Sequence, residues 1–412
     1  MECKLVFTLK HTPTKTDRFR WVVCQVDELK NCATYGDIKS ALDSLPRTLD
    51  ETYERALKGI REDFQEDAAR IFQWLIFSAV PLRLNEIAEV FKTKPGEKDG
   101  IDDERSLLRE DILLQYCGTL VITQEPSERR LSSDKYYEHT TWTKPTKSKE
   151  LRLAHFSVQE YLVSNRIPQD CSKFSILEDT SNLSIAGTCI NYLSDAFGEF
   201  HSKTLPKDFV SRYPLAPYVA EYWPSHIKGE GEMYDALILR VVQFLENKQS
   251  FSYYLHLVNH ENNNGANFYT GPLQLLSPVP ILYVACFYGL TEVSVLMLAH
   301  EVDVNAQGGF YGNALRAASS HGHEGTVRLL LEYGADVNAQ GGFLSNALQA
   351  AISRGHKGIV RLLLEHGADV NAQGGFYGSA LQAGLEGRNK DIVHILKQAG
   401  AAGVLESSES DD

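Results

Sequence analysis

The sequence lacks the short motifs that mark common hydrolase, nucleotide and metal sites. It contains no G-x-S-x-G, the sharp turn that exposes a nucleophilic serine, and no H-E-x-x-H zinc motif. It has no G-x-x-x-x-G-K-[ST], the loop whose backbone amides and lysine hold nucleotide phosphates. No set of cysteines and histidines has the spacing of a zinc site. We therefore expect a protein that is not an enzyme, with no cofactor, no metal and no catalytic residues.

Paired cysteines and long apolar runs are also missing. The seven cysteines are scattered and none forms C-x-x-C, which is typical of reduced thiols inside a cell. The N-terminal stretch MECKLVFTLKHTPTK breaks a short apolar run with lysines, so it predicts no signal peptide. The most apolar zone, 273–299, contains two prolines and Glu292 and is better explained as protein core than as a membrane span. We expect a soluble cytoplasmic protein, with the nucleus as the alternative, and no membrane partner.

Basic residues are outnumbered along the whole chain. The net charge is −13; the chain up to residue 276 has 33 basic and 40 acidic residues, and the rest has 8 and 14. Because phosphates are repelled by such a surface on average, no nucleic-acid partner is expected. Nothing in the sequence indicates a small-molecule substrate either.

What the chain does contain is a repeat. The heptapeptide VNAQGGF occurs at 304–310, 337–343 and 370–376, always 33 residues apart. Segments 308–340 and 341–373 are identical at 25 of 33 positions, and a divergent copy precedes them at 280–307. A period of 33 residues is typical of a turn followed by two short helices.

The residues at the helix ends agree with this prediction. Asn313, Asn346 and Ser379 each stand one residue before an apolar helix, where a side-chain oxygen caps the first turn. Gly322 and Gly355 follow that helix, where a left-handed backbone is easy only for glycine. The repeat therefore predicts two helices per unit with defined ends.

These units resemble ankyrin repeats. The T-P-L-H-x-A box of that family corresponds to N-A-L-R-A-A at 313–318 and P-I-L-Y-V-A at 280–285, although the threonine and histidine are missing. The period, the G-H pair and G-A-D-V-N carry the resemblance. It implies four units over 277–403, stacked into a solenoid. It also implies a protein ligand, bound through the turn tips and the face of the first helices. The acidic, small residues at 404–412 predict a disordered tail.

The candidate partner-binding residues lie in the turns and the first helices. The phenylalanines of the three turns would form an exposed aromatic row, with a second apolar residue beside each; the alternative is that each phenylalanine packs on the neighbouring turn. The positions of Arg316 and Gln349 differ between near-identical copies, which indicates either partner recognition or neutral drift. The candidates in the turns are Phe310, Tyr311, Phe343, Leu344, Phe376 and Tyr377.

The first part of the chain predicts helices followed by a small sheet. Thr48 and Glu51 form a capping box at the start of a helix within 44–60. Further helices are expected over 66–79, 82–91 and 105–118, then strands at 120–124 and 151–156 and a helix capped by Ser157 and Glu160. Three helices followed by two strands is the order of a winged helix, here spanning 66–165 with a long wing insertion at 125–150.

Several stretches resemble the region after the nucleotide-binding core of fungal NACHT–ankyrin, NLR-like proteins. They are FRWVVCQVDEL (19–29), LPRTLDETYERAL (45–57), ARIFQWLIFSAVPLRLNEIAEVF (69–91), LRLAHFSVQEYLVS (151–164), LSIAGTCINYLSD (183–195) and YPLAPYVAEYWPSHI (213–227). The resemblance implies a helical end of the NACHT-like region at 19–65, a winged helix of the "GPI inositol-deacylase" type and a helical linker at 166–276. Residues 1–18 match nothing and are expected to be disordered. The missing phosphate-binding loop is a departure from that family.

Isolated histidines and aromatics have structural explanations. We expect His155 to be a satisfied, partly buried side chain, and His323 and His356 to bond backbone groups within their loops. Tyr218, Tyr222 and Trp223 stand at helical spacing, which favours core packing over a ligand site.

The predicted fold is mainly α, with a winged-helix and helical region followed by an ankyrin-repeat α-solenoid. The predicted function is that of a non-catalytic protein-interaction sensor or adaptor, related to fungal NLR-like signalling proteins. One alternative is a truncated version of a nucleotide-switched NACHT NTPase. Another is a winged-helix transcription regulator, although Arg105 and Arg109 in the third helix are accompanied by Glu110 and Asp111.

Overall fold

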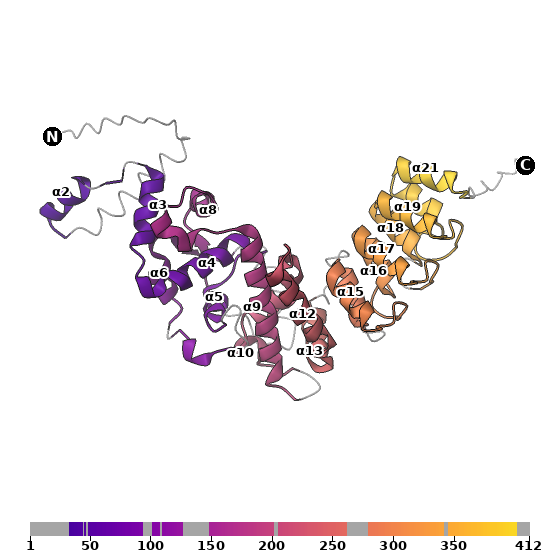
Figure 1. Ribbon diagram of the computed structural model, residues 1–412, viewed down its shortest axis with the longest axis horizontal. Helices are drawn as coiled ribbons and strands as arrows, with labels where there is room; N and C mark the ends of the chain where they lie inside the picture. The colour runs from indigo at the N-terminus through magenta and orange to yellow at the C-terminus, as the bar shows by residue number, and fades with distance from the viewer. Residues whose placement is uncertain are drawn as a thin grey trace, which may run out of the picture. The chain divides into compact units, whose positions relative to one another are not determined.

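The computed structural model describes nine stretches of the chain, which form two compact units. The first unit comprises residues 1–188 and 210–215, and the second comprises 189–209 and 216–412, so the division falls inside helix α9 (Glu178–Gly198). Figure 1 shows the order of the labelled helices along the chain. The described stretches are 33–43, 45–46, 48–93, 101–107, 109–126, 148–201, 205–261, 279–341 and 345–401. The predicted disordered ends 1–18 and 404–412, and all of the wing insertion except 125–126 and 148–150, lie outside them.

The first unit is built from short helices around a buried central helix. Its elements after α2 are α3, α4, α5, α6, α8 and two strands, and α4 contacts α6, β2 and the 3-10 turn Gln169–Phe174. Ile71, Phe72 and Trp74 on α4 are fully buried. The bounds are α2 (Tyr35–Asp43), α3 (Leu49–Lys58), α4 (Gln65–Phe77), α5 (Leu84–Phe91), α6 (Ile112–Cys117), β1 (Val121–Gln124), β2 (Glu150–Leu153) and α8 (Phe156–Leu162).

The two predicted strands pair into a small sheet, and a third segment of backbone, residues 82–84, bonds to its edge. Strands β1 and β2 pair antiparallel, with Val121 opposite Leu153 and Gln124 opposite Glu150. Residues 82–84 join the other edge of β2, because Leu151 N donates to Leu82 O over 2.9 Å and Leu84 N donates to Lys149 O over 2.9 Å. Helices and strands thus follow the predicted order, while membership of the winged-helix class stays a prediction.

Of the two helix caps predicted in this unit, one agrees with the structure and one differs. Thr48 caps α3 as expected, with its hydroxyl accepting from Glu51 N over 3.1 Å. Helix α8, however, is capped by His155, whose Nδ1 accepts from Ser157 N, because the hydroxyl of Ser157 is buried against Tyr53 Oη. The predicted capping box of Ser157 and Glu160 was therefore wrong.

The third predicted helix is much shorter than 105–118. Helix α6 begins at Ile112, and a separate 3-10 turn, Asp103–Arg105, lies upstream with Asp102 as its cap. Arg105 Nη2 binds Asp67 Oδ1 on α4 over 3.0 Å, so a long-range ion pair joins this 3-10 turn to α4. The sequence could not show that contact, since its partners lie 38 residues apart.

The second unit continues with α9, a helical region and four helix pairs. The helical region contains α11 (Ala216–Tyr222), α12 (Glu232–Glu246) and α13 (Lys248–Glu261), while α10 (Phe209–Arg212) crosses the division between the units. The core of this region contains Tyr218 and Trp223, which are almost fully buried, as predicted for packing residues. These helices occupy the predicted linker 166–276.

The four helix pairs, counted over the described part of 279–401, stack with a 33-residue period. Contacts run between successive first helices and between successive second helices, and Figure 1 shows α15 to α21 arranged one after another toward the C-terminus. Oxygens of Asn313, Asn346 and Ser379 accept from backbone amides three residues later, and Gly322 and Gly355 have φ of +83° and +79°. The predicted caps are therefore confirmed. The pairs are α14 (Ile281–Phe287) with α15 (Thr291–Ala299), α16 (Ala314–His321) with α17 (Glu324–Glu332), α18 (Ala347–Arg354) with α19 (Lys357–Glu365), and α20 (Ala380–Glu386) with α21 (Lys390–Gln398).

Candidate functional site

A ladder of asparagines ties each loop of the repeats to the next. Asn305 Nδ2 donates to Gly334 O over 3.2 Å, and its Oδ1 accepts from Asp336 N over 2.8 Å. Asn338 makes the same two bonds to Gly367 and Asp369, and Asn371 donates to Gly400 O. Asn305 and Asn338 thus each satisfy two backbone groups of the following loop, which explains why the asparagine of V-N-A-Q recurs.

The histidines of the G-H pairs form a second set of ties. His323 Nε2 lies 3.0 Å from Phe287 O, and His356 Nε2 lies 3.1 Å from Ser320 O, each in the preceding repeat. The prediction of a backbone partner is confirmed, but the bond joins two repeats instead of closing one loop. Burial lowers the pKa of His323, consistent with a neutral ring. Among the residues that the structure describes, no cluster of histidine, cysteine or acidic side chains is placed to hold a metal ion.

The candidate residues on the first helices are buried. Arg316 is 2% exposed, and its guanidinium donates to Ala339 O, Ser345 O and Gln307 Oε1 over 3.1–3.2 Å. Gln349, at the equivalent position of the next repeat, is 0% exposed. Arg316 therefore joins stacked turns, and neither side chain presents a surface, which corrects the expectation that they face a partner.

Burial of Arg316 has an electrostatic consequence. The desolvated guanidinium has its pKa lowered to about 10, and its hydrogen-bond partners are neutral oxygens. A cation in this setting is stabilised by carbonyl dipoles. The interaction fixes Ala339 and Ser345 against the turn that carries Gln307.

The predicted aromatic row is only partly at the surface. Phe376 is 65% exposed, and Tyr377 is half-buried with its ring 5.0 Å from that of Phe376. Phe310 is half-buried, and Tyr311 is 3% exposed because its ring contacts Phe287 and His321. Tyr311 therefore packs within the stack, contrary to its prediction as an exposed contact residue. Phe343 and Leu344 lie outside the described residues.

The turn that carries Phe376 is held by short-range bonds. Gly374 N donates to Gly378 O over 2.9 Å, and Gln373 and Ser379 form an antiparallel bridge around the tip. Gly375 and Gly378 have φ of +68° and +74°, a left-handed conformation that side chains other than glycine rarely adopt. The exposed phenylalanine therefore sits on a closed, defined turn.

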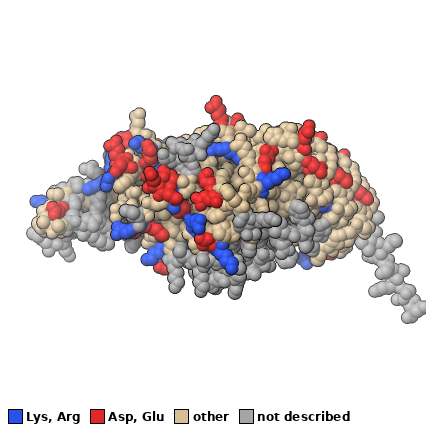
Figure 2. Space-filling model, turned by 90° about the horizontal axis from the view of Figure 1, so that it is seen from below, with Lys and Arg blue, Asp and Glu red and all other residues tan. Residues whose placement is uncertain are grey.

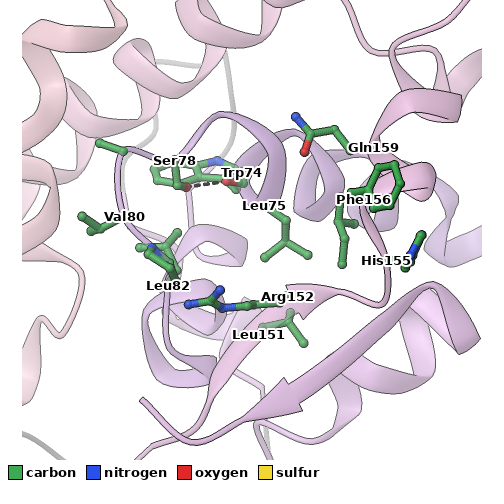
Figure 3. A pocket seen from close by; sticks show the side chains of 13 residues that line it. Trp74, Leu75, Ser78, Val80, Leu82, Leu151, Arg152, His155, Phe156 and Gln159 are labelled. Carbon is green, nitrogen blue, oxygen red and sulfur yellow. Dashed lines mark hydrogen bonds between the residues drawn. The ribbon is translucent and has the colours of Figure 1, made fainter. Parts of the chain in front are cut away.

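A separate cavity of about 250 Å³ lies in the first unit, between the end of α4, the following loop, β2 and the start of α8. Figure 3 shows its labelled side chains arranged around this space. Its walls are mostly apolar, and Arg152 is its charged group. Nε and Nη2 of Arg152 bind Glu150 Oε2 over 3.1 and 2.8 Å, and the Glu150 side chain is completely buried. The charge of Arg152 is therefore balanced by a buried carboxylate. Apolar wall residues include Trp74, Leu75, Val80, Pro81, Leu153 and Phe156.

The titratable groups near this cavity have structural roles. His155 Nδ1 accepts from Ser157 N, and Ser157 Oγ lies 2.6 Å from that nitrogen and 2.7 Å from Tyr53 Oη. Ser157 is 5% exposed, so this chain of hydrogen bonds caps α8 beneath the surface.

The four cysteines among the described residues are buried, and burial raises the pKa of the Cys286 thiol to about 12.

The basic residues of the predicted third helix are paired with carboxylates. Arg105 binds Asp67, and Arg109 Nε lies 3.3 Å from Asp111 Oδ1. Figure 2 shows acidic and basic side chains interspersed on one face of the molecule. Of the helices that the structure describes, none has the length and apolar character needed to cross a membrane.

Comparison with known proteins agrees with the repeat geometry. Residues 314–364 and 348–396 match the family described as ankyrin repeats in many copies. "Azaphilone pigments biosynthesis cluster protein L" of Monascus ruber is 37% identical over 304 residues, which is 70% of this chain and 59% of that protein. The chain thus spans about three fifths of the length of this relative. Because the matched residues coincide with the stacked helix pairs, the C-terminal region of this chain consists of ankyrin repeats.

Proposed function

We propose that the chain is a non-catalytic sensor or adaptor whose ankyrin region binds a protein ligand through its turns. The observation that carries this proposal is Phe376, a phenylalanine 65% exposed at the tip of a closed turn. Exposed aromatic side chains on rigid supports are favoured contact residues in protein interfaces, since little side-chain entropy is lost on binding.

The rigidity of the stack supports the same function. The asparagine ladder, the inter-repeat histidines and Arg316 engage the polar groups between neighbouring repeats. The side chains left exposed on the loops are therefore presented at fixed spacing along the stack. A partner would contact Phe376 and Tyr377 first, with Phe310 further along the same series of turns. Buried Tyr311, Arg316 and Gln349 would support that surface from beneath.

A role related to fungal NLR-like signalling is part of the proposal. Its support is the order of elements that precede the repeats and the similarity to a fungal protein named for a pigment biosynthesis cluster. The absence of catalytic motifs in the sequence favours a regulatory role over an enzymatic one.

A site-specific crosslinking experiment tests the ligand-binding surface. The photoreactive amino acid benzoylphenylalanine would replace Phe376 in the full chain, expressed in the cells that naturally produce it. The matched control carries it at Tyr333, an aromatic residue 48% exposed at the end of α17 and away from the turn tips. We expect a discrete protein adduct from position 376 that is missing from position 333. Equal adducts from both positions, or none from position 376, would contradict the proposal.

A further inference from the structure

A groove lies between α12 of the helical region and α15 of the first repeat, both in the second unit. It encloses about 330 Å³ and is lined by Asp235, Ile238, Leu239, Glu292, Val295 and Leu296. Tyr234 Oη donates to Glu292 Oε2 over 3.0 Å near the start of both helices, and Glu246 Oε1 lies 2.8 Å from His300 Nδ1 near their ends. These two contacts hold the helices side by side with the same direction.

The floor of the groove is apolar and open to solvent. Leu239 is 53% exposed and Val295 is 38% exposed, while Ile238 beneath them is buried. Val295 stands at the position that Arg328 and Arg361 occupy in the next two repeats, and both arginines are exposed. The repeat architecture therefore accepts a charged residue here, and the first repeat alone of these three replaces it with an aliphatic one.

The rim of the groove is acidic. On each helix a carboxylate precedes the exposed aliphatic residue by three or four positions, Asp235 before Leu239 and Glu292 before Val295, which places both on one helical face. Burial and the neighbouring Glu292 carboxylate raise the pKa of Tyr234 to about 12, so the hydroxyl stays protonated and donates to that carboxylate. Arg240, the basic residue of α12, is directed to Asn191 Oδ1 at 3.4 Å.

We propose that this groove is a docking site for an amphipathic helix of a partner protein, with an aliphatic face flanked by lysine or arginine. The aliphatic face would cover Leu239 and Val295, and the basic flanks would meet Asp235 and Glu292. A second copy of this groove would bring like charges together, so charge complementarity favours a basic partner. This surface lies on α12 and α15 and is independent of the turn tips in the proposed function.

Fluorescence anisotropy with a defined peptide tests the proposal on the full chain. The probe is a fluorescein-labelled helical peptide of about 18 residues, with leucine at positions i, i+3, i+4 and i+7 and lysine elsewhere. The control peptide has the same composition in an order that removes the apolar face. We expect saturable binding of the amphipathic peptide, with binding of the scrambled peptide weaker by roughly tenfold or more.

Two variants locate the binding on the protein. Val295→Arg introduces the residue that the next two repeats carry, so it is compatible with the fold and places a cation against the lysines of the peptide. Leu385→Arg makes the same kind of change at a leucine 49% exposed on the last repeat. We expect roughly a tenfold loss of affinity for Val295→Arg and less than about twofold for Leu385→Arg.

Several results would overturn the proposal. These are equal losses for the two arginine variants, equal binding of the two peptides, or a dimer in sedimentation that Val295→Arg dissociates, since a dimer would mean that a second copy occupies the groove. If circular dichroism shows that Val295→Arg is unfolded, Asp235→Lys at an exposed rim position replaces it, with the same expected loss of peptide affinity. Unchanged peptide affinity in Asp235→Lys would also contradict the proposal.

Discussion

His226 is a neutral histidine enclosed in the helical region of the second unit. Its side chain is 2% exposed, and Nε2 lies 3.0 Å from the hydroxyl of Tyr218. Burial, with a smaller contribution from Lys228, lowers the pKa of His226 to about 4, compared with about 6.5 for an exposed histidine. Because the ring is neutral, Tyr218 donates to its unprotonated nitrogen.

This difference in pKa predicts acid sensitivity. Between pH 6.5 and 4 the unfolded chain binds a proton at His226 that the folded chain does not, so the free energy of unfolding falls as the pH falls. The full effect is about 3 kcal/mol and levels off below pH 4. Urea unfolding of the wild type and of His226→Gln at a series of pH values measures it, because glutamine can accept from Tyr218 without titrating.

We expect the stability difference between wild type and His226→Gln to shift by about 3 kcal/mol in favour of the variant from pH 6.5 to pH 4. Acidic residues elsewhere contribute equally to both proteins and cancel in the comparison. Parallel pH profiles would mean that His226 is solvated in the folded chain, contrary to the geometry.

At the scale of single residues, the sequence predicted those features, such as helix caps, that depend only on residues close by in the chain. The caps of the first helices at Asn313, Asn346 and Ser379 were found because each needs only a residue type and a nearby amide. The burial of Arg316 was not foreseen, because its carbonyl partners Ala339 and Ser345 lie 23 and 29 residues away. Arg316 becomes buried against these carbonyl groups only when one repeat stacks on the next.

At the scale of the repeat element, two differences between near-identical copies are coupled. In the second repeat, Gly312 has φ of +87°, and a Cβ built there would lie 2.2 Å from Nη2 of Arg316. In the third repeat the equivalent residues are Ser345 and Gln349. A residue with a Cβ is accommodated where the long arginine is replaced by the shorter glutamine. These substitutions therefore reflect packing within the stack.

A double-mutant cycle tests this coupling. Gly312→Ser alone should destabilise the ankyrin region by about 2–4 kcal/mol, because it combines left-handed strain with displacement of Arg316 from its carbonyl partners. Arg316→Gln alone should cost about 1–3 kcal/mol through lost hydrogen bonds. The double variant recreates the arrangement of the third repeat. Its loss should be smaller than the sum of the single losses by more than about 1 kcal/mol.

Urea unfolding followed by circular dichroism measures the three variants under one condition. Strict additivity would show that Gly312 is required for its backbone conformation alone and that the approach of Arg316 does not matter. The equivalent position in the fourth repeat, Gly378 with Gln382, combines glycine with glutamine. That combination fits the coupling, since glutamine tolerates either residue whereas arginine requires glycine.

The lengths of the helices, like the burial of single residues, were predicted well only where they depend on residues close by in the chain. The repeat helices were placed closely because their periodicity and capping recur with every unit. Of the helix expected over 105–118, only Ile112–Cys117 is α-helical, and Arg105 lies in a separate 3-10 turn where it pairs with Asp67 on another helix. The sequence also did not predict which aromatic residues of the turns are exposed. Phe310 and Phe376 occupy equivalent positions in identical G-G-F-Y-G turns, yet Phe376 is 65% exposed and Phe310 is half-buried.

At the scale of the whole molecule, the chain has two compact units, and the division between them falls inside helix α9. Ile71 on α4 is 1% exposed in the core of the first unit, and Ile359 on α19 is 2% exposed in the core of the second. A repeat stack propagates stability mainly between neighbouring repeats, so its unfolding is governed by local contacts. We therefore expect urea unfolding, followed by far-ultraviolet circular dichroism, to proceed in two transitions.

Matched core substitutions assign those transitions. Ile71→Ala and Ile359→Ala each remove the same side-chain atoms from a closed core and should cost about 3 kcal/mol in the unit that contains them. Each variant should lower the midpoint of one transition and leave the other within error, with the two variants affecting different transitions. If both substitutions lower both midpoints equally, α9 couples the two cores into one cooperative unit, and a ligand bound to the ankyrin region would then stabilise the first unit by mass action as well.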